Sequence, residues 1–252
     1  MGIDISDKYL QVCMIDADDV VTGGRMVSSE AKLREQFEGT HSYRIIVEMG
    51  SSTRWIAELL KSFGHEVLVV DPRRIRLISG SLYKDDKVDA LTLALLGAEA
   101  PRLLKTVPLR DLEHQKALTL VRARACAVMG RTRVVNSVRG MLKPYGYRIP
   151  KSATSTFVSH LSQTLAPEIL ELVGPLAALL DAFDVQIAHY DKEAKRLLPR
   201  LAPEAVHLCE IPGVGPITAL YFVAVVGDPA RFAKARDIGS YLGLCRRRDD
   251  SG

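Results

Sequence analysis

Two aspartates three residues apart stand at the start of a predicted helix. Asp86 and Asp89 open the segment DKVDALTLALLGA, whose apolar residues recur with helical spacing. Side chains three residues apart share one face of a helix, so these carboxylates can bind one divalent cation together. The face continues into Leu93 and Leu96 and so points toward protein, where two like charges are costly unless a cation neutralises them. The alternative is that acids in a first helical turn simply suit the positive end of the helix.

The segments before this helix must position the two acids. Pattern and turn residues predict three short strands, a weak helix, a strand, an amphipathic helix and a further strand, at 1–6, 9–16, 23–28, 31–37, 43–49, 53–63 and 66–70. The first three strands are typical of an antiparallel meander. Where helices cross between parallel strands, ligands bind at the carboxyl ends of those strands, so this edge of the sheet is the place to look for further acids.

Two more carboxylates fall on predicted strands. Asp4 lies between two isoleucines of the first strand, and Glu48 follows three apolar residues of the fourth. Each alone has an ordinary explanation, as a strand-end acid or a solvated residue. Together with Asp86 and Asp89 they form a set from two strands and one helix, and a site that holds two Mg²⁺ about 4 Å apart needs several such oxygen ligands on rigid elements.

Positive charge is concentrated in the middle of the chain. The formal net charge is only +4, yet no acidic residue lies between His114 and Pro167, where nine Lys and Arg residues fall. A long helix is predicted over 112–141, and a helix that only solubilises usually mixes both signs. The segment therefore indicates a polyanionic partner, although a solvated basic face is the simpler alternative. The predicted nucleic-acid-binding residues are Arg122, Arg124, Arg131, Arg133, Arg139 and Lys143.

The last part of the chain has a glycine turn before an apolar helix. A second long helix is predicted over 169–198, as a packing partner of the basic helix or a subunit contact. The sequence IPGVGP at 211–216 then precedes an apolar helix at 217–226. Gly213 and Gly215 let a nucleic-acid backbone come close to free backbone N–H groups, which predicts a helix-hairpin-helix-like element. A plain glycine turn is the alternative.

The motifs occur in an order that resembles one family. "GIDIS" with Asp4, "VEMG" with Glu48, and "KDDKVDA", a KxDxxDA pattern with Asp86 and Asp89, resemble the DEDD domain of the IS110-type transposases, a family similar to the Piv DNA invertases. The later "GDP" and "YLGL" elements match the family's second domain. The resemblance implies a RuvC-type, RNase H-like α/β domain, then a mainly helical region, then a helical C-terminal domain with the helix-hairpin-helix-like element. The expected boundaries are 1–105, 106–200 and 201–252.

The resemblance also implies a chemistry. Asp4, Glu48, Asp86 and Asp89 would bind Mg²⁺, with Mn²⁺ as a substitute, and Ser251 would be the nucleophile in DNA cleavage and strand transfer. The implied partners are DNA, a structured guide RNA and further copies of the chain. The family usually has a proline one residue further on than "GL", where this chain has Arg246. The family also continues beyond Gly252, so the chain is expected to be C-terminally truncated and weak or inactive in strand transfer.

The cysteines and the absence of a targeting segment indicate where the protein acts, and the motifs leave three other functions open. The four cysteines have no metal-ligand spacing, and no signal peptide or membrane-spanning run appears, so a reducing, cytoplasmic location without membrane contact is expected. The acids alone also permit a Holliday-junction resolvase that uses water as nucleophile. An actin-like kinase would explain "GIDIS" but lacks a second phosphate loop. A non-catalytic nucleic-acid-binding remnant is the remaining alternative.

Overall fold

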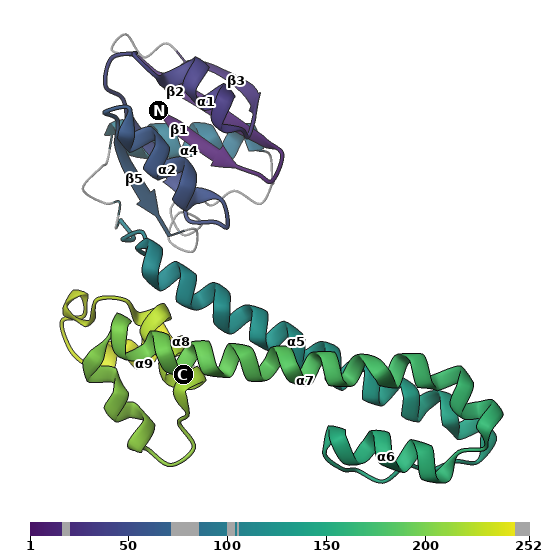
Figure 1. Ribbon diagram of the computed structural model, residues 1–252. Helices are drawn as coiled ribbons and strands as arrows, with labels where there is room; N and C mark the ends of the chain where they lie inside the picture. The colour runs from purple at the N-terminus through teal and green to yellow at the C-terminus, as the bar shows by residue number, and fades with distance from the viewer. Residues whose placement is uncertain (17–20, 72–85, 100–103, 105, 245–252) are drawn as a thin grey trace, which may run out of the picture. The chain divides into compact units, whose positions relative to one another are not determined.

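The computed structural model describes residues 1–16, 21–71, 86–99, 104 and 106–244, apart from the side chains of Asp86, Lys87 and Ser155 (Figure 1). The chain forms two compact units, Met1–Arg110 and Asp111–Gly252. Each unit has its own hydrophobic core.

The first unit is built on a mixed five-stranded sheet in the order β3-β2-β1-β4-β5. The two β1–β2 and β2–β3 pairings are antiparallel, and the β1–β4 and β4–β5 pairings are parallel. This order and these directions are compatible with the RNase H-like fold predicted from the sequence. The strands are β1 (Gly2–Ile5), β2 (Tyr9–Ile15), β3 (Val21–Val27), β4 (Arg44–Glu48) and β5 (Glu66–Val70).

Helices cover both faces of this sheet. Ile3, Ile45 and Val47 are fully buried on one face, in a core with the apolar residues of α1 (Glu30–Phe37) and α2 (Thr53–Ser62). On the other face, Ile46 and Cys13 pack against α4 (Asp86–Glu99). Side chains alternate between the faces of a strand, so residues two apart from Ile46 lie on the same face as α4.

A pair of long helices forms the second unit. The helices α5 (Leu112–Leu142) and α7 (Pro167–Leu201) run side by side, and Gly130 of α5 faces the Phe183 ring of α7 (Figure 1). At one end of the pair, α6 (Thr154–Thr164) packs its apolar residues against α5 and α7. The other end packs against the 3₁₀ helix η3 (Pro203–Glu210) and α8 (Pro216–Val226). The remaining short elements are η2 (Lys143–Tyr145), η4 (Pro229–Arg231) and α9 (Arg236–Tyr241).

Two features of the second unit differ from the sequence-based expectation. The expected boundary at 200 falls inside α7, and α8 shares one core with α5 and α7, so the regions expected at 106–200 and 201–252 form one unit. The helix-hairpin-helix-like element is not confirmed. The segment before the glycine turn is the 3₁₀ helix η3, and its Ala205 is buried in the core shared with α8.

The start of α5 is held by Asp111. Its Oδ1 accepts a hydrogen bond from the His114 backbone N–H at 2.9 Å, and its Oδ2 lies 2.6 Å from the His114 ring Nδ1. Burial alone would raise the pKa of Asp111, but these contacts with His114 lower it. A carboxylate here also suits the positive end of the helix.

We expect Asp111→Ala to lower the free energy of unfolding by about 1 kcal/mol, as the loss of other N-caps does. Because the folded state lowers the pKa of Asp111, the stabilisation is complete above the range of an unfolded Asp, about pH 4, and is lost as the pH falls through the lower folded value. Urea unfolding at several pH values measures this. A difference between variant and wild type that persists at the acid end would contradict it.

Candidate active site

Asp4 and Glu48 lie side by side on the sheet. In the parallel pairing of β1 and β4, Gly2 lies opposite Ile46 and Ile3 opposite Val47, so the next residues in this register are Asp4 and Glu48. Ile3 and Val47 point into the core under α1 and α2, so the two carboxylates lie on the opposite face, which α4 covers. Neighbouring strands are about 4.8 Å apart. The register therefore brings the two acids near each other at the carboxyl ends of adjacent parallel strands.

The helix α4 packs unusually close to β1. A Cβ atom on Gly2 would lie 2.2 Å from the Ala90 carbonyl oxygen and 2.4 Å from the Ala94 backbone N. Only a glycine permits this approach. The helix begins at Asp86, and half-buried Asp89 is one residue before the contact with Gly2. The elements that carry all four predicted acids are therefore packed together.

These elements supply the oxygen donors that Mg²⁺ prefers. Carboxylates from neighbouring strands can bind one cation together, and the register of β1 and β4 makes Asp4 and Glu48 such neighbours. Among the side chains that the structure describes, no three of His, Cys, Asp or Glu form a metal-binding group. Asp4, Glu48 and Asp89 are among these side chains and do not form such a group. The side chain of Asp86 is not described, so the fit to a metal rests on the Asp4 and Glu48 pair and on the position of α4.

The turn after Glu48 is braced by Thr53, a residue that sequence reasoning missed. The Thr53 side chain is fully buried at the first turn of α2. Its Oγ1 donates a hydrogen bond to the Glu48 carbonyl oxygen at 2.6 Å and accepts one from the Gly50 N–H at 2.8 Å. Thr53 thus fixes the backbone from which the Glu48 carboxylate projects. A Ser-Ser-Thr run before an amphipathic helix was the available signal.

Three of the predicted nucleic-acid-binding arginines have partners inside the protein. Arg124 of α5 pairs with Asp191 of α7 at 3.1 Å, and Arg131 pairs with Asp184 at 2.5 Å. Arg139 donates from Nη2 to the Pro150 carbonyl oxygen at 2.7 Å. These contacts join segments of the helical unit, so the three residues contribute to its structure.

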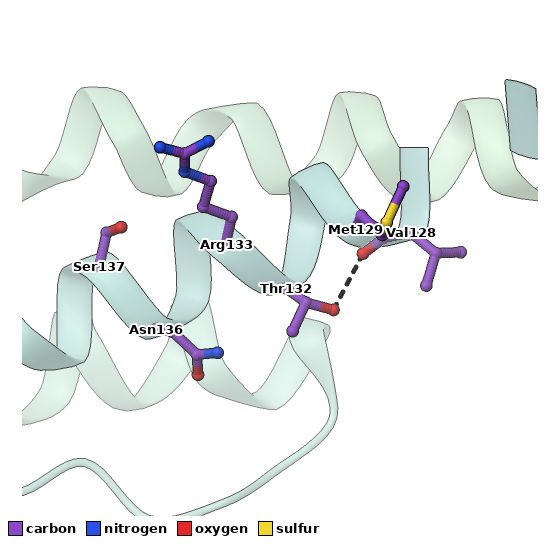
Figure 2. A pocket seen from close by; sticks show the side chains of 6 residues that line it. All are labelled: Val128, Met129, Thr132, Arg133, Asn136 and Ser137. Carbon is purple, nitrogen blue, oxygen red and sulfur yellow. Dashed lines mark hydrogen bonds between the residues drawn. The ribbon is translucent and has the colours of Figure 1, made fainter. Parts of the chain in front are cut away.

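Arg122, Arg133 and Lys143 are exposed on α5 and at its end. Among the described residues, no acidic side chain forms an ion pair with Arg133. It lines an open hollow of about 570 Å³ whose walls are side chains of α5 alone, and Figure 2 shows them projecting from consecutive turns. The Thr132 hydroxyl is held by the Val128 carbonyl at 2.9 Å. The hollow is lined by Val128, Met129, Thr132, Arg133, Asn136 and Ser137.

The glycine turn at 211–216 has the predicted backbone form. Gly213 has φ +86°, which favours glycine, and Gly215 is the N-cap of α8 with Pro216 at the first helical position. Both glycines are exposed. Their role in nucleic-acid binding stays a prediction. The predicted nucleophile, Ser251, lies outside the described residues.

Comparison with known proteins decides the family. A family model described as "Transposase", for the DEDD domain of IS110 elements, matches residues 1–146. A second model, described as "Transposase IS116/IS110/IS902 family", matches residues 205–252. The chain belongs to the IS110 family of transposases. It is an enzyme of the transposase and site-specific recombinase class, and DNA is the partner on which such enzymes act.

Curated relatives agree with this assignment. The transposase is 26% identical over 264 residues to "Transposase for insertion sequence element IS1111A" of Coxiella burnetii, an alignment that covers 100% of this chain and 70% of the relative. It is 26% identical over 215 residues to the transposase for IS1328 of Yersinia enterocolitica, covering 82% and 62%. It is 27% identical over 272 residues to the "Pilin gene-inverting protein" of Moraxella lacunata, covering 100% and 73%.

The transposase thus spans between 62% and 73% of the lengths of these three relatives. Within its described residues, none of the helices has both the length and the apolar character needed to cross a bilayer.

Proposed function

We propose that this transposase cuts and joins DNA by Mg²⁺-dependent chemistry, with Asp4, Glu48, Asp86 and Asp89 as metal ligands and Ser251 as the nucleophile. One observation carries the proposal: Asp4 and Glu48 are neighbours at the ends of two parallel strands, on the face covered by the helix that begins at Asp86. The close packing of β1, β4 and α4, the rigid elements that carry the four acids, supports this proposal.

In the cleavage step one bond to the scissile phosphorus forms and one breaks. The Ser251 oxygen bonds to the scissile phosphorus and loses its proton, while the bond from phosphorus to the leaving DNA oxygen breaks and that oxygen takes up a proton. When bound, Mg²⁺ stabilises the charge that develops on the phosphate oxygens. The covalent serine–DNA link conserves the phosphodiester, so a second DNA end can attack it and restore Ser251. Thr53 keeps the Glu48 backbone in place during these steps.

We extend the proposal to a structured guide RNA and to an oligomer. Sequence choice can be delegated to base pairing while the protein contacts backbone and shape. The acid-free stretch on α5, with exposed Arg122 and Arg133, supports contacts of this kind. Joining two DNA ends also requires that two active sites be held together, which supports assembly of several copies.

A denaturing gel tests the proposal. The protein is incubated with labelled element-end DNA, transcript of the flanking region and Mg²⁺. We expect a covalent protein–DNA species that disappears in Ser251→Ala and in EDTA. Cleavage that persists in Ser251→Ala without a covalent species would instead support water as the nucleophile, as in a junction resolvase.

The exposed and the paired arginines of α5 should differ in binding. We expect Arg122→Gln with Arg133→Gln to weaken nucleic-acid binding and to lower the slope of log affinity against log salt by about 1.8, if each arginine contacts one phosphate of a duplex. Arg124→Gln with Arg131→Gln removes the same charge but breaks the ion pairs with α7. This second double variant should mainly lower the melting temperature of the protein. If both double variants had the same slope of log affinity against log salt, the distinction between exposed, nucleic-acid-binding arginines and ion-paired, structural arginines would be contradicted.

A further inference from the structure

A second hollow lies where the chain turns back at the end of α5. It has a volume of about 560 Å³ and lies beside η2. Three of its six lining residues are cationic, and none is acidic. The lining residues are Arg139, Lys143, Gly146, Tyr147, Arg148 and Ile149.

The wall of this hollow is fixed by three hydrogen bonds. The Tyr147 backbone N–H donates to the Leu142 carbonyl at 3.2 Å, and the Tyr147 hydroxyl accepts from the Ala166 N–H at 3.2 Å. The third bond joins Arg139 to the Pro150 carbonyl at 2.7 Å. Gly146 has φ +82°, which lets the chain reverse here. A wall that is already ordered loses little entropy when it binds a ligand.

The three cations differ in what holds them. Arg139 is anchored by Pro150 and lies over the Phe157 ring, 5.1 Å from its centroid. Its Nε–H has no acceptor among the described residues. No acidic side chain of the described residues pairs with Lys143 or Arg148, and both are exposed. A lysine at a helix C-terminus gains from the helix dipole, but Arg148 lies outside the helix and gains nothing from it.

We infer that this hollow, hereafter the corner site, binds one or two neighbouring phosphates of a nucleic-acid backbone. Three cations on a fixed wall repel one another, and a polyanion relieves that repulsion. The hollow is too large for a single small ion and is open enough for a sugar–phosphate chain, while Tyr147 and Ile149 give it an apolar side. This inference rests on the proposed function only in that the ligand is a nucleic acid.

Salt-dependent binding tests the corner site. The variant Lys143→Gln with Arg148→Gln removes its two exposed cations and leaves Arg139, which has a structural role. The control, Lys192→Gln with Lys195→Gln, removes two exposed lysines of α7 that do not line the hollow. Affinity is measured in EDTA against labelled duplex DNA and a labelled RNA hairpin over a range of salt concentrations, so the result does not depend on the metal site.

We expect the corner variant to lower the salt slope on duplex DNA by about 1.8, because two phosphate contacts are lost at about 0.9 each. The control should keep the wild-type slope. A loss seen with the RNA hairpin alone would identify RNA as the ligand and still support the site. If the corner variant had the same salt slopes as the control on both nucleic acids, the proposed corner site would be wrong. Circular dichroism melting confirms that both variants are folded.

Discussion

Asp4→Asn should abolish Mg²⁺-dependent processing of element-end DNA while leaving DNA affinity nearly unchanged. The carboxylates are proposed to hold cations, whereas the exposed arginines of α5 are proposed to contact phosphates. Lewis-acid stabilisation by a metal is worth several kcal/mol, and each 1.4 kcal/mol is about tenfold in rate. We therefore expect the rate to fall by at least about a hundredfold, and the same for Glu48→Gln, Asp86→Asn and Asp89→Asn.

Asp7→Asn is the matched control for this result. Asp7 follows β1 by two residues and is exposed, so the change removes a carboxylate from the same part of the chain without touching the α4 face. We expect it to keep wild-type activity. Single-turnover cleavage measures the rate and filter binding measures the affinity. Full activity of Asp4→Asn in Mg²⁺ would show that the proposed metal site is wrong.

Gly2→Ala should damage both stability and activity. The added methyl group would lie 2.2 Å from one backbone atom of α4 and 2.4 Å from another, and backbone atoms cannot turn aside as a side chain can. Overpacking of this kind typically costs about 1–3 kcal/mol. Because α4 carries Asp86 and Asp89, its displacement should also lower the cleavage rate at temperatures where the variant is fully folded.

Gly24→Ala provides the comparison for Gly2. Gly24 also lies in a strand, β3, but a Cβ atom there would meet nothing within 4 Å. We expect its free energy of unfolding to be unchanged or slightly higher, since alanine restricts the unfolded chain. Urea denaturation measures both variants. If Gly2→Ala were as stable as Gly24→Ala, the close contact between β1 and α4 would not exist.

Many of the helices and strands could be predicted because the signals that determine them are local in sequence. The strand at Glu66–Val70 was predicted with the bounds that the structure shows, and α2 and α5 were each within one residue at both ends. Short apolar runs between turn residues and helical periodicity both depend on neighbours in sequence. The meeting of Asp4 and Glu48 followed from the parallel order of their strands.

The rest depends on contacts between residues distant in sequence. Arg124 and Asp191 are 67 residues apart, and their pairing depends on how α5 and α7 align, which no local pattern reveals. The shared core of α5, α7 and α8 also could not be read from periodicity, which shows that a face is apolar but not what covers it. The close approach of α4 to Gly2 has the same origin, because a glycine near a strand start has several explanations.

Anomalous diffraction from crystals soaked in Mn²⁺ tests the central claim most directly. Mn²⁺ takes the same oxygen ligands as Mg²⁺ and scatters anomalously. We predict a peak bonded to the carboxylates of Asp4 and Glu48, with Asp86 or Asp89 completing the shell, and no such peak in Asp4→Asn. A peak bound elsewhere, or none at these four acids at saturating Mn²⁺, would contradict the account.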